Sequence, residues 1–171
     1  MGFKDIFLTN IVLNLKHIGC LLDPYNKSIW KHWIHLYMLK GKSFWQVKAP
    51  SQCSWYWRKL LKLRPVAKPL LIHQIGNGEH TSLWFDNWLP MGSLMDNYPE
   101  RLVYDAAINI NAKVSAIIRG LEWDWPVSHS IYLDAVRPIL SNFPPLLAPL
   151  TQLVGVLLLL EPLTSPSFGT I

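Results

Sequence analysis

The chain has 171 residues, half of them apolar, so it is long enough to bury one main core. Its formal net charge of +5 conceals an asymmetry: residues 1–75 carry twelve Lys and Arg against two acidic residues, whereas residues 76–171 carry four against nine. Two cysteines, Cys20 and Cys53, are too few for a disulfide framework, and no run is typical of a secretory signal. These features predict an intracellular protein, nuclear or cytoplasmic, whose basic half faces polyanions.

The first part of the chain has two segments with helical periodicity. The first predicted helix ends at Asp23-Pro24, and its apolar stripe consists of Ile11, Leu15, Ile18 and Leu22, with Asn10 and Asn14 off the stripe. The second has Ser28 as N-cap and Gly41 just past its end. Its predicted apolar stripe consists of Trp30, Trp33, Ile34 and Tyr37.

A third helix is predicted to begin near Ser54, and Pro65 is expected to stop or kink it. Its apolar stripe consists of Trp57, Leu60 and Leu61, while Arg58, Lys59 and Lys62 spread over the other faces. The following segment, "IGNGEHTSLWFDNWLP" at 75–90, is predicted to be a β-hairpin with a type I′ turn at Asn77-Gly78. Pro90 would close its aromatic second strand.

In that strand, alternation would place Ser82, Trp84, Asp86 and Trp88 on one face and Leu83, Phe85 and Asn87 on the other. A fourth helix is predicted over 111–120, with Asn111 as N-cap and Gly120 as its stop, and a last short helix, disturbed by Pro138, over 130–140. The fold class expected from these elements is mainly α with a small β-hairpin, an α+β fold.

Catalytic and metal-binding patterns are not found in the sequence. Cys20, His32, His35 and Cys53 could in principle hold a metal, but structural zinc sites usually bring ligands in close pairs, and each cysteine stands alone. No two of Asp86, Asp96, Asp105 and Asp124 are adjacent, so we interpret them as surface and cap residues and not as a two-metal site. The sequence predicts no enzyme activity and no cofactor.

Basic and aromatic residues are interleaved in the first half, as in single-strand nucleic-acid binders. The candidate site for RNA or single-stranded DNA consists of Lys48, Trp55, Trp57, Arg58, Lys59, Lys62, Arg64 and Lys68. Two simpler interpretations stay open: the cations could form a solvated helix face, and the tryptophans could be core residues, because each buries a large apolar area.

Several segments, in order, carry a family resemblance: "MGFKDIFLTNIVLNLKHI", "KSFWQVKAPSQCSWYWRKLLKLR", "IGNGEHTSLWFDNWLP", "ERLVYDAAINI", "NAKVSAII" and "WDWP". Together they resemble the segment downstream of the polymerase domain in plant LINE-type non-LTR retrotransposon reverse transcriptases. The resemblance covers residues 1–145 and implies a loosely packed partial domain, a connector within a larger polyprotein. The family's catalytic Tyr-x-Asp-Asp turn has no counterpart here, so no catalytic or metal residue is carried over.

The resemblance ends near Pro144-Pro145, where the family's zinc-binding region would begin and a hydrophobic Pro- and Leu-rich tail, 146–171, appears instead. We expect this divergent tail to lie outside the fold. The resulting hypothesis is a truncated retrotransposon-derived protein without polymerase activity that binds RNA or single-stranded DNA weakly. The alternative is a domesticated protein-interaction module that uses exposed aromatics. A membrane anchor is not expected, because residues 146–160 include Pro149 and are too short for a bilayer span.

Overall fold

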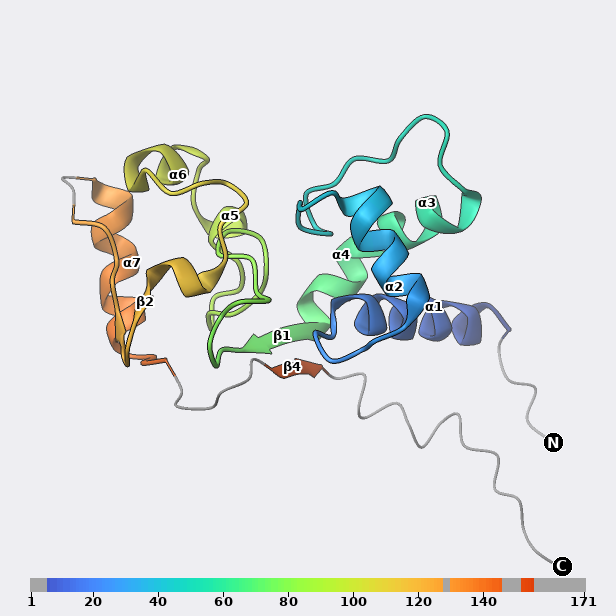
Figure 1. Ribbon diagram of the computed structural model, residues 1–171, viewed down its shortest axis with the longest axis horizontal. Helices are drawn as coiled ribbons and strands as arrows, with labels where there is room; N and C mark the ends of the chain where they lie inside the picture. The colour runs from blue at the N-terminus through green and yellow to red at the C-terminus, as the bar shows by residue number, and fades with distance from the viewer. Residues whose placement is uncertain (1–5, 128–129, 146–151, 156–171) are drawn as a thin grey trace, which may run out of the picture.

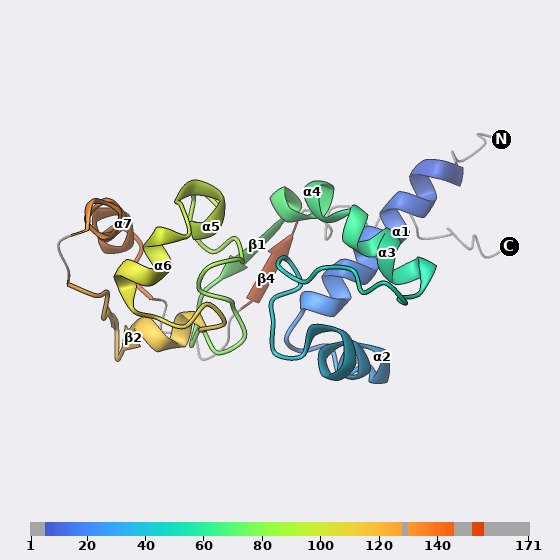
Figure 2. The same cartoon turned by 90° about the horizontal axis from the view of Figure 1, so that it is seen from above.

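The computed structural model describes residues 6–127, 130–145 and, through the backbone alone, 152–155. Two groups of helices lie on either side of a short antiparallel sheet, and each group has its own hydrophobic core (Figure 1). Seen from above, strands β1 and β4 lie between the groups (Figure 2). The fold is mainly helical with small two-stranded sheets, which confirms the α+β class expected from the sequence.

The elements follow one another along the described chain as α1 (Ile6–Leu22), α2 (Ile29–Trp33), the π-helix η1 (Ile34–Leu39), α3 (Trp55–Lys62), α4 (Arg64–Ala67), the 3₁₀ helix η2 (Lys68–Leu70), β1 (Leu71–Gln74), α5 (Leu94–Asn97), α6 (Arg101–Ala106), the 3₁₀ helix η3 (Val114–Ile117), β2 (Ile118–Arg119), β3 (Glu122–Trp123), α7 (Ile131–Ser141) and β4 (Gln152–Gly155).

The first core forms around α1, which ends before Asp23-Pro24 as predicted. From α1 it takes Leu15, Ile18 and Leu21. Asn14 is also buried, contrary to the expectation that it lies off the apolar stripe. Its Nδ2 donates to the backbone oxygen and to Oδ1 of Asn10, both at 2.6 Å, and these bonds satisfy the buried amide.

The second predicted helix begins at Ser28, whose Oγ accepts a hydrogen bond from the Lys31 N–H. After Trp33 it widens into the π-helix η1, so the four-residue spacing of its side chains is lost. Of the predicted stripe only Ile34 is buried, while Trp33 and Tyr37 are exposed, so the predicted apolar face was wrong. Lys40, at a φ of 49°, and Gly41, at 80°, end the helix.

The third predicted helix corresponds to α3, where Ser54 Oγ accepts from the Trp57 N–H and Trp57 and Leu60 are buried. The third helix ends at Lys62, just before Pro65, in agreement with the expected stop or kink. The chain turns at Leu63, and Pro65 then lies in the first turn of α4, where a missing N–H costs nothing. The helices α4 and η2 lead directly into β1.

The predicted hairpin at 75–90 is not formed. Of its two turn residues only Gly78 has a positive φ, 70°, whereas a type I′ turn needs both. The residues after it run through the second core as an irregular segment in which 81–84 and 86–89 are all buried, so the two faces predicted by alternation do not exist. The indole N–H of Trp84 donates to Asn109 and that of Trp88 to Leu83, at 2.9 Å each.

The predicted helix over 111–120 is also absent. Its place is taken by the single 3₁₀ turn η3 and the tight hairpin β2–β3, which turns at Gly120 with a φ of 64°. The N–H groups of Val114 and Ser115 donate to the carbonyls of Thr81 and Gly78. Because these donors bind the neighbouring segment, an α-helical ladder does not form there.

The last predicted helix is α7, which contributes Leu133, Val136 and Leu140 to the second core and continues through Pro138 to Ser141. Strand β4 pairs antiparallel with β1, from Leu71 opposite Gly155 to Gln74 opposite Gln152. The expectation that the tail lies outside the fold therefore does not hold for 152–155. The other tail residues, 146–151 and 156–171, lie outside the described residues, and the division at 145 stays a prediction.

Candidate nucleic-acid interface and polar cleft

The exposed side of α3 carries the central part of the predicted site. Trp55 is 72 % exposed, and Lys59 Nζ lies 5.0 Å from the centroid of its ring. Lys59 Nζ also donates to Asn10 Oδ1 at 2.7 Å, so the ammonium is held between α1 and the indole. The ammonium lies over one face of the ring, and the high exposure of Trp55 leaves the ring accessible to a stacking partner.

Arg58 lies next to this pair and is exposed, as are Lys48 and Lys62. Its Nη2 donates to the Ser51 carbonyl at 2.7 Å, and its Nε donates to Cys53 Sγ at 3.4 Å. These bonds hold the loop that precedes α3. We call the five accessible residues of this region the basic face: Lys48, Trp55, Arg58, Lys59 and Lys62.

Trp57 was predicted to stack on bases together with Trp55, and this was wrong. Its side chain is 1 % exposed and packs edge-on against Phe44, with 5.8 Å between the ring centroids. On an eight-residue amphipathic helix, neighbours two positions apart point to opposite faces, so only one of the two tryptophans can reach solvent.

Arg64 and Lys68 are the predicted site residues that lie away from the basic face. Arg64 is half-buried with its guanidinium carbon 4.8 Å from the Phe44 ring centroid, and burial lowers its pKa to about 10. Its Nε and one Nη are buried and have no hydrogen-bond partner among the described residues. Lys68 forms an ion pair with Asp96 and donates to Ser93 Oγ at 3.0 Å, which links the two helical groups.

A second feature, not predicted from the sequence, is a cavity of about 310 Å³ between the two cores, here called the polar cleft. Apolar residues Leu22, Leu39 and Phe44 contribute from the first core. The charged and polar lining residues come from both sides: Lys31, His35, Lys42, Ser43, His73, Glu79, His80, Ser82, Asp86 and Lys113.

The innermost side chains of the polar cleft are His73, from β1, and Asp86, from the irregular segment. Both residues are 5 % exposed, and His73 Nε2 lies 4.0 Å from Asp86 Oδ2. Asp86 Oδ2 accepts the Ser82 N–H at 2.6 Å, whereas His73 Nε2 has no hydrogen-bond partner in the described chain. The pKa of His73 is lowered, mainly by burial. The Asp86 carboxylate opposes this shift, and the Lys113 ammonium adds to it.

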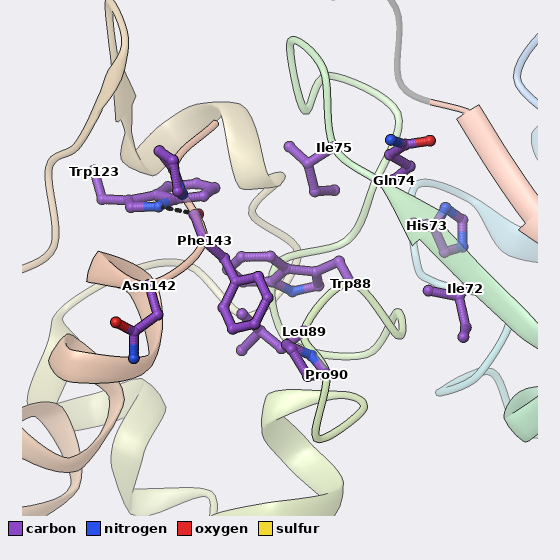
Figure 3. A pocket seen from close by; sticks show the side chains of 11 residues that line it. Ile72, His73, Gln74, Ile75, Trp88, Leu89, Pro90, Trp123, Asn142 and Phe143 are labelled. Atoms are coloured by element: carbon purple, nitrogen blue, oxygen red, sulfur yellow. Dashed lines mark hydrogen bonds between the residues drawn. The ribbon is translucent and has the colours of Figure 1, made fainter. Parts of the chain in front are cut away.

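A third feature is an apolar cavity of about 530 Å³ on the other side of β1, the aromatic pocket. Figure 3 shows Trp88, Trp123 and Phe143 gathered on one side and the strand residues Ile72 to Gln74 on the other. The Trp123 Nε1 donates to the Phe143 carbonyl at 2.8 Å, the dashed line in Figure 3. Because Trp88 Nε1 donates to Leu83, both indole donors are engaged within the protein.

The aspartates interpreted as surface and cap residues fall into two groups. Asp96, Asp105 and Asp124 form ion pairs with Lys68, Arg101 and Arg119 respectively. Asp86 is buried, so the surface interpretation was wrong for it, and the apolar residues flanking it in the sequence were the available signal. Within residues 6–127 and 130–145 no group of three or more His, Cys, Asp or Glu side chains could hold a metal ion. Cys20 is exposed and Cys53 is buried, and both are free thiols.

Comparison with known proteins found no match: neither a family model nor a curated protein nor a solved structure matches the chain. Of the helices in the described part of the chain, none combines the length and the apolar character needed to cross a bilayer.

Proposed function

We propose that this chain binds single-stranded nucleic acid, RNA or DNA, weakly through the basic face, as a retrotransposon-derived connector without polymerase activity. The observation that carries the proposal is the exposed Trp55 ring with Lys59 Nζ held 5.0 Å from its centroid. A base stacked on an exposed ring contributes about 1–3 kcal/mol, and it does so for any base. Sequence-independent binding follows from this chemistry.

The cations around Trp55 supply the phosphate contacts. Arg58, Lys59 and Lys62 lie on α3 and Lys48 on the loop between η1 and α3, and all four are exposed or half-exposed. Each phosphate neutralised contributes about −0.7 to the slope of log affinity against log salt for a single strand. Four contacts therefore give a slope of about −3. With so shallow a slope, salt weakens binding only moderately, and a modest affinity remains at physiological salt.

The test is fluorescence anisotropy with labelled single-stranded RNA and DNA over a series of salt concentrations. The double variant Arg58→Glu, Lys62→Glu is expected to reduce binding strongly, and Trp55→Ala to reduce it without changing the salt slope. Lys27→Glu is a control that changes charge at an exposed residue on the α1–α2 connection. A slope near zero, or equal affinity for the double variant and the control, contradicts the proposal.

A second candidate function, docking of a protein partner, is favoured by the exposed aromatics of α2 and η1. Trp33 and Tyr37 are 46 % and 59 % exposed, and their ring centroids lie 5.4 Å apart. Ile29 and Leu36 are exposed on the same helices. Large exposed apolar side chains that cluster are typical of interaction surfaces. Binding to a partner through them would respond little to salt, which separates this function from nucleic-acid binding.

The absence of polymerase activity is tested separately. The purified chain with magnesium, an RNA template and a primer is expected to give no extension product, because the acidic turn of the family that it resembles has no counterpart in its sequence. Extension that survives purification, and that is lost together with the protein on immunodepletion, contradicts this part of the proposal.

A further inference from the structure

We propose that the polar cleft between the two cores is a binding site for a phosphate group, either the free ion or the phosphate of a small monoester. The site is distinct from the basic face, because it is lined by residues of α2, η1, β1 and the segment around Lys113 and by none of the basic-face residues. Phosphate binding in the cleft can therefore be tested independently of nucleic-acid binding through α3.

The cleft has an excess of cationic groups. Lys31, Lys42 and Lys113 converge on it from both cores, against two carboxylates. Among the described residues these three lysines form no ion pair; the Lys31 ammonium donates to the Asp23 carbonyl, and the Asp23 carboxylate acts on it from farther away. Ammonium groups that converge on a small cavity without carboxylate partners favour a dianion there, because their mutual repulsion is relieved when it binds.

Lys113 faces the cleft from the second core. Its ammonium lowers the pKa of His35, on η1, and the pKa of His73, on β1, in each case after the larger effect of burial. Lys113 lines the same cavity as both histidines. The two cores therefore present their cations to a common space.

A buried nitrogen of His73 supports the phosphate site independently of the lysines. Its ring is more than nine-tenths buried, and its Nε2 has no hydrogen-bond partner in the described chain. His73 lines both the polar cleft and the aromatic pocket, and Asp86, whose Oδ2 lies 4.0 Å from this Nε2, lines the polar cleft. A buried ring nitrogen without a partner costs free energy unless a ligand hydrogen-bonds to it.

The two carboxylates do not cancel this charge. Asp86 Oδ2 already accepts the Ser82 N–H, and Glu79 is exposed at the edge of the cavity. The volume, about 310 Å³, lies at the lower end of the range of about 300–1,000 Å³ found for ligand sites. It admits a phosphate with a small organic substituent and excludes a folded nucleic-acid segment.

The experiment is a calorimetric titration of the full chain carrying Trp55→Ala, which removes base stacking on the basic face, with orthophosphate, adenosine monophosphate and adenosine. Orthophosphate or the monophosphate is expected to saturate one site, and adenosine is expected not to bind. Tighter binding of the monophosphate assigns the cleft to phosphate monoesters, and tighter binding of orthophosphate assigns it to the free ion. Adenosine binding as tightly as its monophosphate overturns the proposal, because the base and sugar then supply the affinity.

Two variants locate the site. Lys113→Gln and Lys42→Gln are each expected to weaken phosphate binding about tenfold or more, since each removes a charge-assisted hydrogen bond. Lys42 is exposed, so its replacement leaves the fold intact and keeps the test valid even where Lys113→Gln unfolds the chain. Lys48→Gln, on the basic face, is the matched control and is expected to bind phosphate normally. Equal affinities for the two cleft variants and the control, or no saturable binding, overturn the proposal.

Discussion

Nε2 of His73 lies 4.0 Å from Oδ2 of Asp86, and both side chains are buried although they are thirteen positions apart in the chain. The pair fixes strand β1 against the irregular segment of the second core. The His73 N–H also donates to the Asn87 carbonyl at 2.7 Å, so the backbone and the side chain of His73 contact the same segment. The protonation state of His73 is thereby linked to the contact between β1 and this segment.

The stability of the protein is therefore expected to fall as the pH falls. Burial holds the pKa of His73, and also that of His35, below the ordinary value of 6.5. Below that pH the unfolded chain binds protons that the folded chain does not, so the free energy of unfolding decreases. Urea denaturation between about pH 7 and pH 5 measures this slope.

The variant His73→Gln removes one of the two titrating groups and is expected to reduce the dependence of unfolding free energy on pH. His80→Gln, at an exposed position of the same cleft, is the control and should keep the slope of the unaltered chain. Parallel curves for His73→Gln and the unaltered protein would show that His73 titrates normally.

Trp55 and Trp57 provide a second prediction, because they differ in burial and share a helix. Trp57→Ala is expected to lower the free energy of unfolding by about 3–5 kcal/mol through the cavity that it leaves. Trp55→Ala is expected to change it by less than about 0.5 kcal/mol, because that side chain is exposed. Thermal or urea unfolding of the two variants measures the difference, and similar losses in both would contradict the assigned orientation of α3.

A third prediction concerns two glycines in the left-handed region. A Cβ on Gly78 would lie 2.7 Å from the backbone nitrogen of Ser115, whereas a Cβ on Gly120 would have nothing within 4 Å. Gly120→Ala is expected to cost about 1 kcal/mol, the backbone penalty alone. Gly78→Ala should cost clearly more, since η3 would have to move away from it. Equal losses in the two variants would mean that the contact between residue 78 and η3 is absent in solution.

The helices that the sequence predicts well are those whose signals are local. Ser28 and Ser54 cap their helices through hydrogen bonds that need no distant partner, and the stripe of α1 follows a regular helical period. The predicted helix over 111–120 failed because Val114 and Ser115 donate to residues more than thirty positions away. Such pairing is not encoded in the local pattern.

The predicted hairpin failed for a related reason. Alternation in 82–88 indicated a strand with two different faces, but Leu83 and Asn87, from one predicted face, are buried just as Trp84 is from the other. The polar cleft could not be foreseen either, since His73 and Asp86 meet only through the packing of β1 against the irregular segment. The cations of the basic face could be predicted in outline from charge. Which of the two tryptophans reaches solvent depends on how α3 is turned relative to the first core.

A fourth prediction tests the pairing of β4 with β1. The His73 N–H donates to Asn87, and donors alternate along a strand, so the N–H groups of Ile72 and Gln74 face β4. Truncation after Pro145 is expected to accelerate hydrogen exchange at Ile72 and Gln74 and to leave His73 protected. Truncation after Gly155 is the control that retains the strand. Unchanged exchange at both amides after the shorter truncation would show that β4 does not pair with β1 in solution.

The last prediction concerns the replacement of Arg64. Its guanidinium is half-buried against Phe44 and stays charged at neutral pH, because burial lowers its pKa only to about 10. Two of its nitrogens have no partner in the described chain, and such a buried charge is costly. Arg64→Met replaces it with a flexible apolar side chain of similar length that can pack on the Phe44 ring. The free energy of unfolding is therefore expected to stay unchanged or to rise by about 1 kcal/mol.

Arg58→Met is the matched control, and it should lose about 0.5–1.5 kcal/mol with its bond to the Ser51 carbonyl. A loss in Arg64→Met larger than that of the control would mean that the guanidinium has a partner that stabilises the fold.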